Sequence, residues 1–303
     1  MDDAVQSVKS AGEIPIGASE DNDDRPFDSD VLDKCPSCGP VTANQRFVYA
    51  LGRIVFRFPN MGLEREYAQI QKGAGTAGLT NGEVDLKVIS DPQNRYLARQ
   101  LCWVMVIEGL DTYVLIPRDP ADLDLVLKAL RPAPSPWDVD LVIGRLGPLA
   151  SPAMCNGLTI PMVGVDQIYS FDRDALVKSI PRPKDASEKQ DKRFAAIAAT
   201  IFETIMQMAD NAGATDDHRA VNYLAVRYPG IYGKAAELYA QDAPLTAVEV
   251  RQSRLSGVRK VVDVIISFTN RQTADASERW FVRVDVTEEF PFVVSGMARF
   301  FDR

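Results

Sequence analysis

The amino-acid sequence predicts an α+β protein, in which an N-terminal mixed α/β lobe is followed by helices packed on a four-stranded antiparallel sheet. The first observation is composition: 46% of the 303 residues are hydrophobic and 25% are charged, as in globular proteins. The second is that β-rich runs alternate with helix start signals up to about residue 180. The third is that three helical patterns and then four runs of period two follow residue 190. We therefore expect three regions, with the bounds 1–44, 45–187 and 188–303.

The first region is expected to be a disordered acidic leader, because it is rich in Asp, Ser and Gly and poor in aromatic residues. Residues 1–34 hold ten acidic and three basic side chains, so they carry −7 of the net charge of −8. The nearly neutral remainder has no basic run, which argues against nucleic-acid binding through phosphate neutralisation. No segment has the length or pattern of a membrane span or a signal peptide. With four cysteines in 303 residues, we expect reduced thiols and a cytoplasmic protein.

The N-terminal lobe is expected to begin with a strand, because residues 47–58 are rich in β-branched and aromatic side chains despite some helical spacing. Thr80 and Glu83 form a capping box, and Asp91-Pro92 and Asp119-Pro120 each place an N-cap before a proline at the first helical position. These signals, with the flanking patterns, predict helices over 63–71, 80–90, 92–101 and 119–130, and strands over 102–107, 112–116, 139–143 and 160–165. A glycine-rich loop is expected at 72–82, a PAPSP linker at 132–136, a short helix from Asp172 to Ile180, and a connector over 181–192.

The C-terminal lobe is expected to change from helical to period-two patterning near residue 245. The predicted helices are 194–209, 216–228 and 231–241, and the predicted strands are 247–252, 261–268, 280–286 and 291–295. Short connections between four strands favour an antiparallel meander packed on the preceding helices.

The sharpest local motif is Cys35-Pro36-Ser37-Cys38-Gly39. The spacing is typical of a zinc knuckle, in which backbone N–H groups of the turn point at the thiolates, and also of a redox CxxC pair. A closed zinc site needs four ligands, and Cys155 is the better candidate for a third because Cys102 lies in an apolar run typical of a core thiol. The candidate metal ligands are Cys35, Cys38 and Cys155. A site completed by remote cysteines, a site shared across a homodimer and an unmetallated pair all stay open, with zinc as the candidate cofactor.

Other motifs favour structural roles, and no catalytic or organic-cofactor-binding residue is assigned. His218 is the single histidine, so a Ser-His-Asp or Cys-His arrangement would depend on it alone, and its position favours a polar residue in a first helical turn. The spacing of Gly73, Gly75 and Gly78 fits GxGxxG, but no strand precedes it and no Lys-Ser or Lys-Thr follows it. Aspartates in first helical turns favour the positive end of the helix dipole. Four tyrosines either pack helices or line a peptide groove: Tyr223, Tyr228, Tyr232 and Tyr239.

Four longer strings carry a resemblance to a known family: RFVYALGRIVFRFP (46–59), QNRYLARQLCWVMVIEGLDTYVL (93–115), RAVNYLAVRYPGIY (219–232) and FVRVDVTEEFPF (281–292). They resemble the C-terminal domain of PatG-type cyanobactin maturation proteases, as does CPSCG just before FVYALG. The resemblance covers roughly residues 35–303. The subtilisin-like protease part of that family is absent here, so the resemblance implies a stand-alone version of the accessory domain without protease activity.

The resemblance implies a non-catalytic interaction protein in the biosynthesis of ribosomally made, modified peptides. The expected partner is a precursor peptide or a subtilisin-like maturation protease, because an exposed sheet edge can accept a peptide strand. Two alternatives stay open: a zinc-containing or otherwise unrecognised peptide-modifying enzyme, and a purely structural oligomeric protein.

Overall fold

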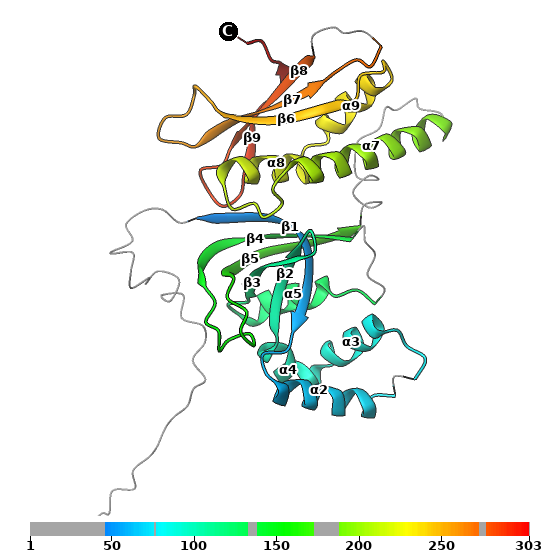
Figure 1. Ribbon diagram of the computed structural model, residues 1–303, viewed down its shortest axis with the longest axis vertical. Coiled ribbons are helices and arrows are strands. Elements are labelled where there is room, and N and C mark those ends of the chain that lie inside the picture. Colours follow the sequence, from blue (N-terminus) through cyan, green and yellow to red (C-terminus); the bar gives the residue numbers. More distant parts are fainter. Residues whose placement is uncertain (1–45, 76, 133–137, 173–187, 273–276, 303) are drawn as a thin grey trace, which may run out of the picture.

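The computed structural model describes residues 46–75, 77–132, 138–172, 188–272 and 277–302, and it places two lobes one above the other (Figure 1). The predicted leader with Cys35 and Cys38, most of the PAPSP linker and the helix predicted after Asp172 lie outside these residues. No helix in the described ranges has the length and apolar character needed to cross a membrane.

Five strands of the N-terminal lobe close into a barrel in the order β1-β2-β3-β5-β4. Only the β3–β5 pair is parallel, and a helix, α5, connects β3 to β4. This order with a helix at that position is the arrangement of an OB-type Greek-key barrel. The N-terminal mixed α/β lobe predicted from the sequence is therefore confirmed, and the structure adds the closure of its five strands into a barrel. The strands are β1 (Phe47–Arg57), β2 (Cys102–Ile107), β3 (Leu110–Ile116), β4 (Asp138–Leu149) and β5 (Pro161–Asp172).

Strand β1 changes partners at Gly52: its first half pairs with β4 and its second half with β2. The change requires a glycine, because a Cβ atom there would lie 2.4 Å from the carbonyl oxygen of Val106. The buried Asp140 carboxylate accepts a hydrogen bond from the backbone N–H of Ile54 at 2.8 Å and one from Arg131 at 3.0 Å. Burial raises the pKa of Asp140, and the Arg131 charge opposes that rise.

Side chains of the barrel alternate between its interior and its outside, as expected for β-strands. In β2, Trp103 and Met105 lie in the interior core, whereas Cys102 and Val104 join a separate outer cluster. The outer face of β1 and β4 belongs to a third core, which also contains helices of the C-terminal lobe. The outer side chains of β2 and those of β1 and β4 are therefore packed in two separate clusters.

Among the described residues, four helical segments lie between β1 and β2, and α5 lies between β3 and β4. The starts of α3, η1 and α5 carry the predicted caps and prolines, whereas the Asn60 cap of α2 was not predicted and α4 has no side-chain cap. Thr80 and Glu83 form the predicted capping box, and the Asp119 carboxylate caps α5 at 2.7 Å and 2.9 Å. The bounds are α2 (Met61–Gly73), α3 (Asn81–Ile89), η1 (Pro92–Asn94), α4 (Arg95–Gln100) and α5 (Pro120–Ala129). In Figure 1, α2 to α4 lie at the end of the barrel far from the C-terminal sheet.

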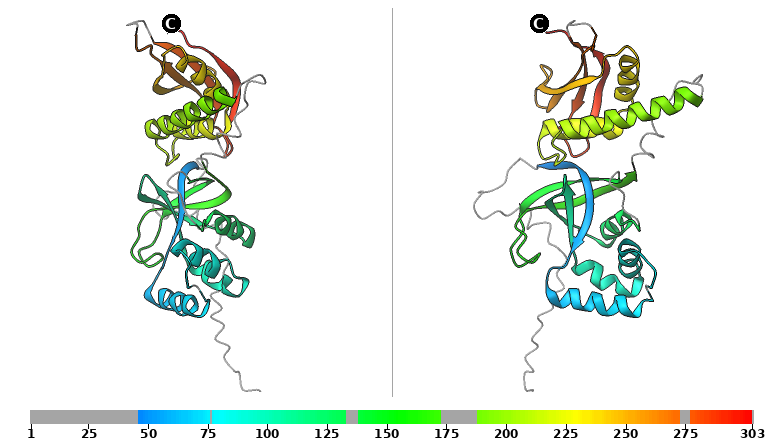
Figure 2. Two further views of the ribbon diagram at one scale, coloured as in Figure 1. Left: turned by 90° about the vertical axis from the view of Figure 1, so that its right-hand side faces the viewer. Right: turned by 45° about the vertical axis from the view of Figure 1, so that its right-hand side comes forward.

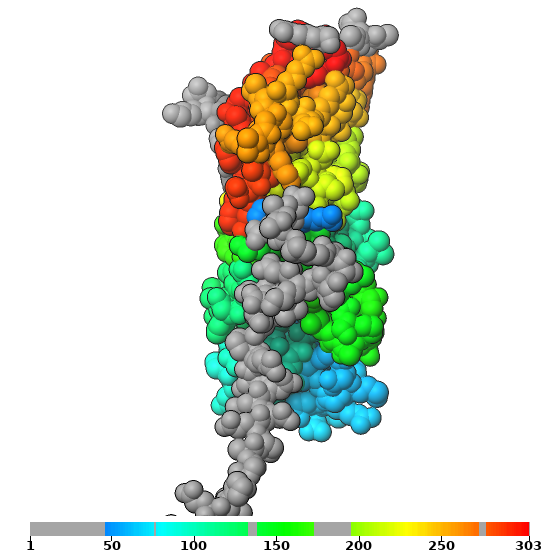
Figure 3. Space-filling model, turned by 90° about the vertical axis from the view of Figure 1, so that its left-hand side faces the viewer, coloured from blue at the N-terminus to red at the C-terminus, as the bar shows by residue number. Residues whose placement is uncertain are grey.

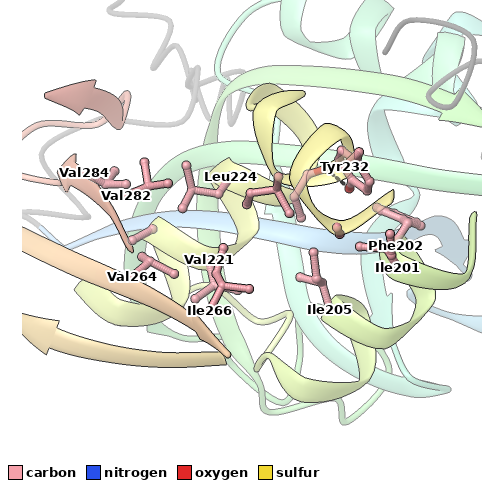
Figure 4. Packing of buried hydrophobic residues seen from close by; sticks show 14 of the residues in the cluster. Ile201, Phe202, Ile205, Val221, Leu224, Tyr232, Val264, Ile266, Val282 and Val284 are labelled. Atoms are coloured by element: carbon pink, nitrogen blue, oxygen red, sulfur yellow. Dashed lines mark hydrogen bonds between the residues drawn. The ribbon is translucent and has the colours of Figure 1, made fainter. Parts of the chain in front are cut away.

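The C-terminal lobe is a four-stranded antiparallel sheet in the order β6-β7-β8-β9, with helices on one face (Figure 2). The predicted connector 181–192 was placed too far along the chain, because α7 already begins at Glu188. Side chains of α7, α8 and α9 pack on Val264, Ile266, Val282 and Val284 of the sheet (Figure 4). The bounds are α7 (Glu188–Met208), α8 (Asp216–Arg227), α9 (Gly230–Tyr239), β6 (Leu245–Gln252), β7 (Val261–Phe268), β8 (Glu278–Asp285) and β9 (Phe292–Arg299).

The two lobes meet where the α7–α8 loop pairs with the first half of β1. The N–H groups of Tyr49 and Leu51 donate to the carbonyl oxygens of Gly213 at 3.1 Å and Asn211 at 2.9 Å. The buried Asn222 amide on α8 donates to the carbonyl oxygen of Tyr49 at 2.8 Å. Helix α8 thus contacts both β1 of the barrel and β7 of the sheet. Figure 3 shows the C-terminal unit stacked on the barrel, with part of β1 at the junction.

Candidate functional site

The structure pairs Cys155 with Cys102 in a disulfide whose Cα atoms are 5.8 Å apart. This differs from the expectation of a free core thiol at Cys102 and of a thiolate zinc ligand at Cys155, because a disulfide sulfur is not a thiolate. Cys35 and Cys38 lie outside the described residues. Within the described part of the chain, no group of three or more His, Cys, Asp or Glu side chains could hold a metal ion.

The disulfide holds the loop between β4 and β5 against the outer face of β2 and β3. Ala150, Cys155 and Leu158 of that loop pack with Val104 and Val114 of the barrel. In OB-type barrels this face and the flanking loops commonly bind ligands. Here the loop occupies it, and two shallow cavities remain beside the loop, of about 640 Å³ and 470 Å³, both bordered by Cys155.

His218 and the glycine-rich loop have the structural roles favoured by the sequence. His218 lies in the first turn of α8, where its backbone N–H donates to the Thr215 hydroxyl and its Nδ1 is 3.3 Å from Asp210. In the glycine-rich loop, the carbonyl oxygens of Ala74 and Gly75 accept from the Lys87 ammonium at 2.7 Å and 3.3 Å. The loop therefore presents carbonyl oxygens to a cation at this point, unlike a phosphate cradle, which presents N–H groups.

Two tyrosines cap the edge strand β9 of the C-terminal sheet: Tyr223 of α8 and Tyr228, which directly follows that helix. The backbone N–H of Met297 donates to the Tyr228 hydroxyl at 3.0 Å, and the backbone of Val293 bonds to the Tyr223 hydroxyl. The Tyr232 side chain is buried and its hydroxyl donates to the carbonyl oxygen of Ala225. These three tyrosines therefore pack helices and block an edge, and they do not line one groove.

The opposite edge strand, β6, has outward backbone groups with no protein partner among the described residues. Ser253 and Val261 form a hydrogen-bonded pair at 2.9 Å, and bonded pairs alternate along an antiparallel ladder. The N–H and C=O groups of Val248, Val250 and Gln252 consequently point away from β7. Their side chains and those of their neighbours are half-buried or exposed along the whole strand.

The outer face of the C-terminal sheet, opposite the helices, combines arginines with phenylalanine rings. Arg251 and Arg279 lie over the Phe300 ring, at 5.5 Å and 4.7 Å from its centroid, and both form ion pairs with Asp302. The Phe281 and Phe300 rings meet edge to face at 6.0 Å. A cavity of about 460 Å³ lies beside these groups and is also bordered by Arg254, Arg283 and Arg299.

A cluster of carboxyl groups lies where the β8–β9 loop meets the barrel. Glu289 hydrogen-bonds to Asp166 of β5, and Asp166 also pairs with Arg118. Arg145 lies 4.0 Å from Asp166, on the same side of the barrel. Burial, and then the neighbouring Asp166, raise the pKa of Glu289 to about 7. The backbone of this loop is held by Arg219 of α8, which donates to the carbonyl oxygens of Val286, Glu288 and Glu289.

The described residues thus form an OB-type barrel joined to a helix-covered antiparallel sheet with one open edge. Residues 188–300 match the family model described as PatG C-terminal. A solved structure named "PatG Domain of Unknown Function" is 19% identical, with a TM-score of 0.65, and the match covers 85% of this chain and 99% of that one. That likeness shows a shared fold. No curated protein matches the chain.

Sequence reasoning missed both the disulfide and the distinction between the two sheet edges. Cys102 and Cys155 are 53 residues apart, and no local signal connects them. The period-two strands predicted two edges, but the tyrosines that cap one of them come from a helix about 70 residues earlier. For the outer face of the sheet, the sequence did contain a signal: Arg279, Phe281 and Arg283 occupy alternate positions of β8 and so share one face.

Proposed function

We propose that this protein is a non-catalytic interaction module that binds an extended peptide by strand addition to β6. The partner is a precursor peptide of ribosomally made, modified products, or a segment of a maturation protease that acts on it. This biosynthetic context comes from the PatG resemblance, whereas the mode of binding comes from the edge strand.

The observation that carries the proposal is the contrast between the two edges of one sheet. Unpaired edge strands promote aggregation, and folded proteins commonly block them. Tyr223 and Tyr228 block β9, but the outward groups of Val248, Val250 and Gln252 on β6 find no partner in the described chain. Strand addition uses such main-chain groups for affinity and alternate side chains for specificity.

A substitution at Val250 tests the edge directly. Proline is tolerated in edge strands where the N–H faces outward, so Val250→Pro removes one outward donor and no ladder bond to β7. Val250→Ala is the matched control, because it shortens the same partly buried side chain and keeps the N–H. We expect Val250→Pro to weaken binding of the cognate precursor peptide at least tenfold in calorimetry, and Val250→Ala to weaken it less than threefold.

Further measurements distinguish strand addition at β6 from other modes of peptide binding. A peptide N-methylated at alternate amides should bind at least tenfold more weakly than its unmodified form. Equal affinity of Val250→Pro and Val250→Ala for the peptide would overturn strand addition at β6. Absence of binding heat with every precursor peptide and maturation protease encoded beside the gene would overturn the interaction role itself.

A further inference from the structure

The segment Phe300–Asp302 occupies part of the outer face of the C-terminal sheet. It continues from β9, and the N–H of Phe300 donates to the carbonyl oxygen of Arg279 at 2.8 Å. The Phe300 ring then lies against Phe281 and in contact with the guanidinium groups of both Arg251 and Arg279. The same two arginines hold the Asp302 carboxylate, Arg251 at 3.3 Å. The Phe300 ring and the Asp302 carboxylate therefore contact the same two arginines.

The face beneath this segment is positively charged when Asp302 is set aside. Glu249 and Asp263 pair with arginines of the face at 2.6–2.9 Å. Among the described residues around the face, those two carboxylates stand against four arginines: Arg251, Arg254, Arg279 and Arg283. Arg299 pairs with Glu278 over the Trp280 ring, on the helix-covered side of the sheet. Guanidinium groups bind carboxylates in charge-assisted bonds and stack on aromatic rings. The complementary ligand is an aromatic side chain with a carboxylate close to it in the chain.

We propose that this face is a docking surface for an acidic-aromatic peptide segment, with an aromatic residue followed two residues later by Asp or Glu, and that Phe300–Asp302 occupies it as an internal competitor. The inference rests on the proposed function, because it names the class of peptide. The cavity of about 460 Å³ beside Phe300 gives room for flanking side chains. Since the side chains of Glu249 and Arg251 also lie on this face, a strand added at β6 would place alternate side chains toward it.

A tethered segment competes at a high effective concentration, so the unmodified protein should bind a free copy weakly. The double variant Phe300→Ala/Asp302→Asn vacates the surface and keeps the backbone bond to Arg279. The probe is a fluorescein-labelled peptide with the sequence of residues 298–303, and the control peptide carries the same Ala and Asn replacements. We expect the double variant to bind the probe at least tenfold more tightly than the unmodified protein does, and to bind the control peptide at least tenfold more weakly than the probe.

A third replacement assigns the binding to the arginines. Arg279→Gln in the double variant should abolish probe binding, whereas Arg53→Gln, at an exposed barrel arginine, should leave it unchanged. Circular dichroism and urea unfolding establish that each variant is folded. A folded double variant that does not bind the probe, or that binds probe and control peptide equally, would falsify the proposal.

Two outcomes separate this inference from strand addition. If Val250→Pro weakens probe binding but the Phe and Asp replacements in the peptide do not, the edge binds peptides and the assignment of the face is wrong. If the Phe and Asp replacements in the peptide abolish binding and Val250→Pro does not, the face binds the peptide without strand addition at β6. The unmodified protein could instead form a dimer that the double variant does not form. In that case Phe300–Asp302 of one copy binds the face of another copy, which contradicts a separate peptide partner.

Discussion

Gly52 fixes the point at which β1 leaves β4 and joins β2, and it does so through the space that a missing side chain provides. A Cβ atom would lie 2.4 Å from the Val106 carbonyl oxygen and 2.9 Å from Cγ1 of Ile107. The first of these atoms belongs to the backbone of a strand that is buried on both faces, so it has little freedom to move. An alanine at this position would therefore strain the barrel where β1 changes partners.

We predict that Gly52→Ala destabilises the protein by about 1–3 kcal/mol, the usual range for overpacking a core. Urea unfolding followed by circular dichroism measures the change in the free energy of unfolding. Gly73→Ala is the matched control: nothing lies within 4 Å of its Cβ position at the end of α2, and an alanine there should be neutral or slightly stabilising. Equal stabilities of the two variants would contradict the steric account.

Residue-scale signals explain much of what the sequence predicted correctly. The Thr80–Glu83 capping box and the Asp119 cap act within four residues of one another, so the local sequence is sufficient to specify them. Cys102 shows the opposite case, because its apolar neighbours are those of any core thiol. Its partner, Cys155, is brought close only by the β4–β5 loop. The local sequence therefore contains no signal that would connect Cys155 with Cys102.

At the scale of elements, prediction succeeded where the apolar run spans the whole strand, as in β2 and β7. In β7 the inward positions are valine, isoleucine and phenylalanine, and the bounds of the strand agree with the sequence pattern. Strands β4 and β5 extend well beyond their apolar runs, to Leu149 and Asp172, because their polar ends are held by pairing with each other. Barrel closure likewise depends on strand pairing that no single segment encodes.

The β8–β9 loop carries a pH-dependent contact between the lobes. Glu289 has an ordinary pKa of 4.5 when exposed and a pKa of about 7 in the folded protein, so the folded state binds this proton more tightly. For an acid with a raised pKa, stability falls as pH rises from about 4.5 to about 7. Because the carboxyl is only half-buried, solvent screening reduces the full value of the shift, and we expect an effect of about 1–2 kcal/mol.

We predict that Glu289→Gln removes this loss, because the amide stays neutral and can still donate to Asp166. The free energy of unfolding of the variant should increase relative to the unmodified protein between pH 4.5 and 7 and then level off. Glu288→Gln, at the exposed neighbouring side chain, should run parallel to the unmodified protein across that range. A constant difference between Glu289→Gln and the unmodified protein from pH 4.5 to 8 would contradict the assignment.

At the scale of the whole molecule, the barrel and the sheet share one apolar core. Tyr49, Leu51 and Leu141 of the barrel lie in the same buried cluster as Ile201 and Leu224 of the helices. The backbone of residues 211–213 also pairs with the free side of β1. Burying apolar surface of both lobes together couples their stabilities, because neither can unfold without exposing the other.

We predict that the two lobes unfold in a single transition. Trp103 lies in the barrel and Trp280 in the C-terminal sheet. A variant that keeps either of them as its single tryptophan, with Trp137 and the other one replaced by phenylalanine, therefore reports on one lobe by fluorescence. The urea midpoints of the two variants should coincide. Gly213→Ala should separate them, because a Cβ atom would lie 2.0 Å from the Tyr49 carbonyl oxygen and the glycine has a φ of +61°. Gly257→Ala, with no atom within 4 Å, is the control and should leave the midpoints coincident. If the two single-tryptophan variants with Gly213 intact have different urea midpoints, the shared core does not couple the unfolding of the lobes.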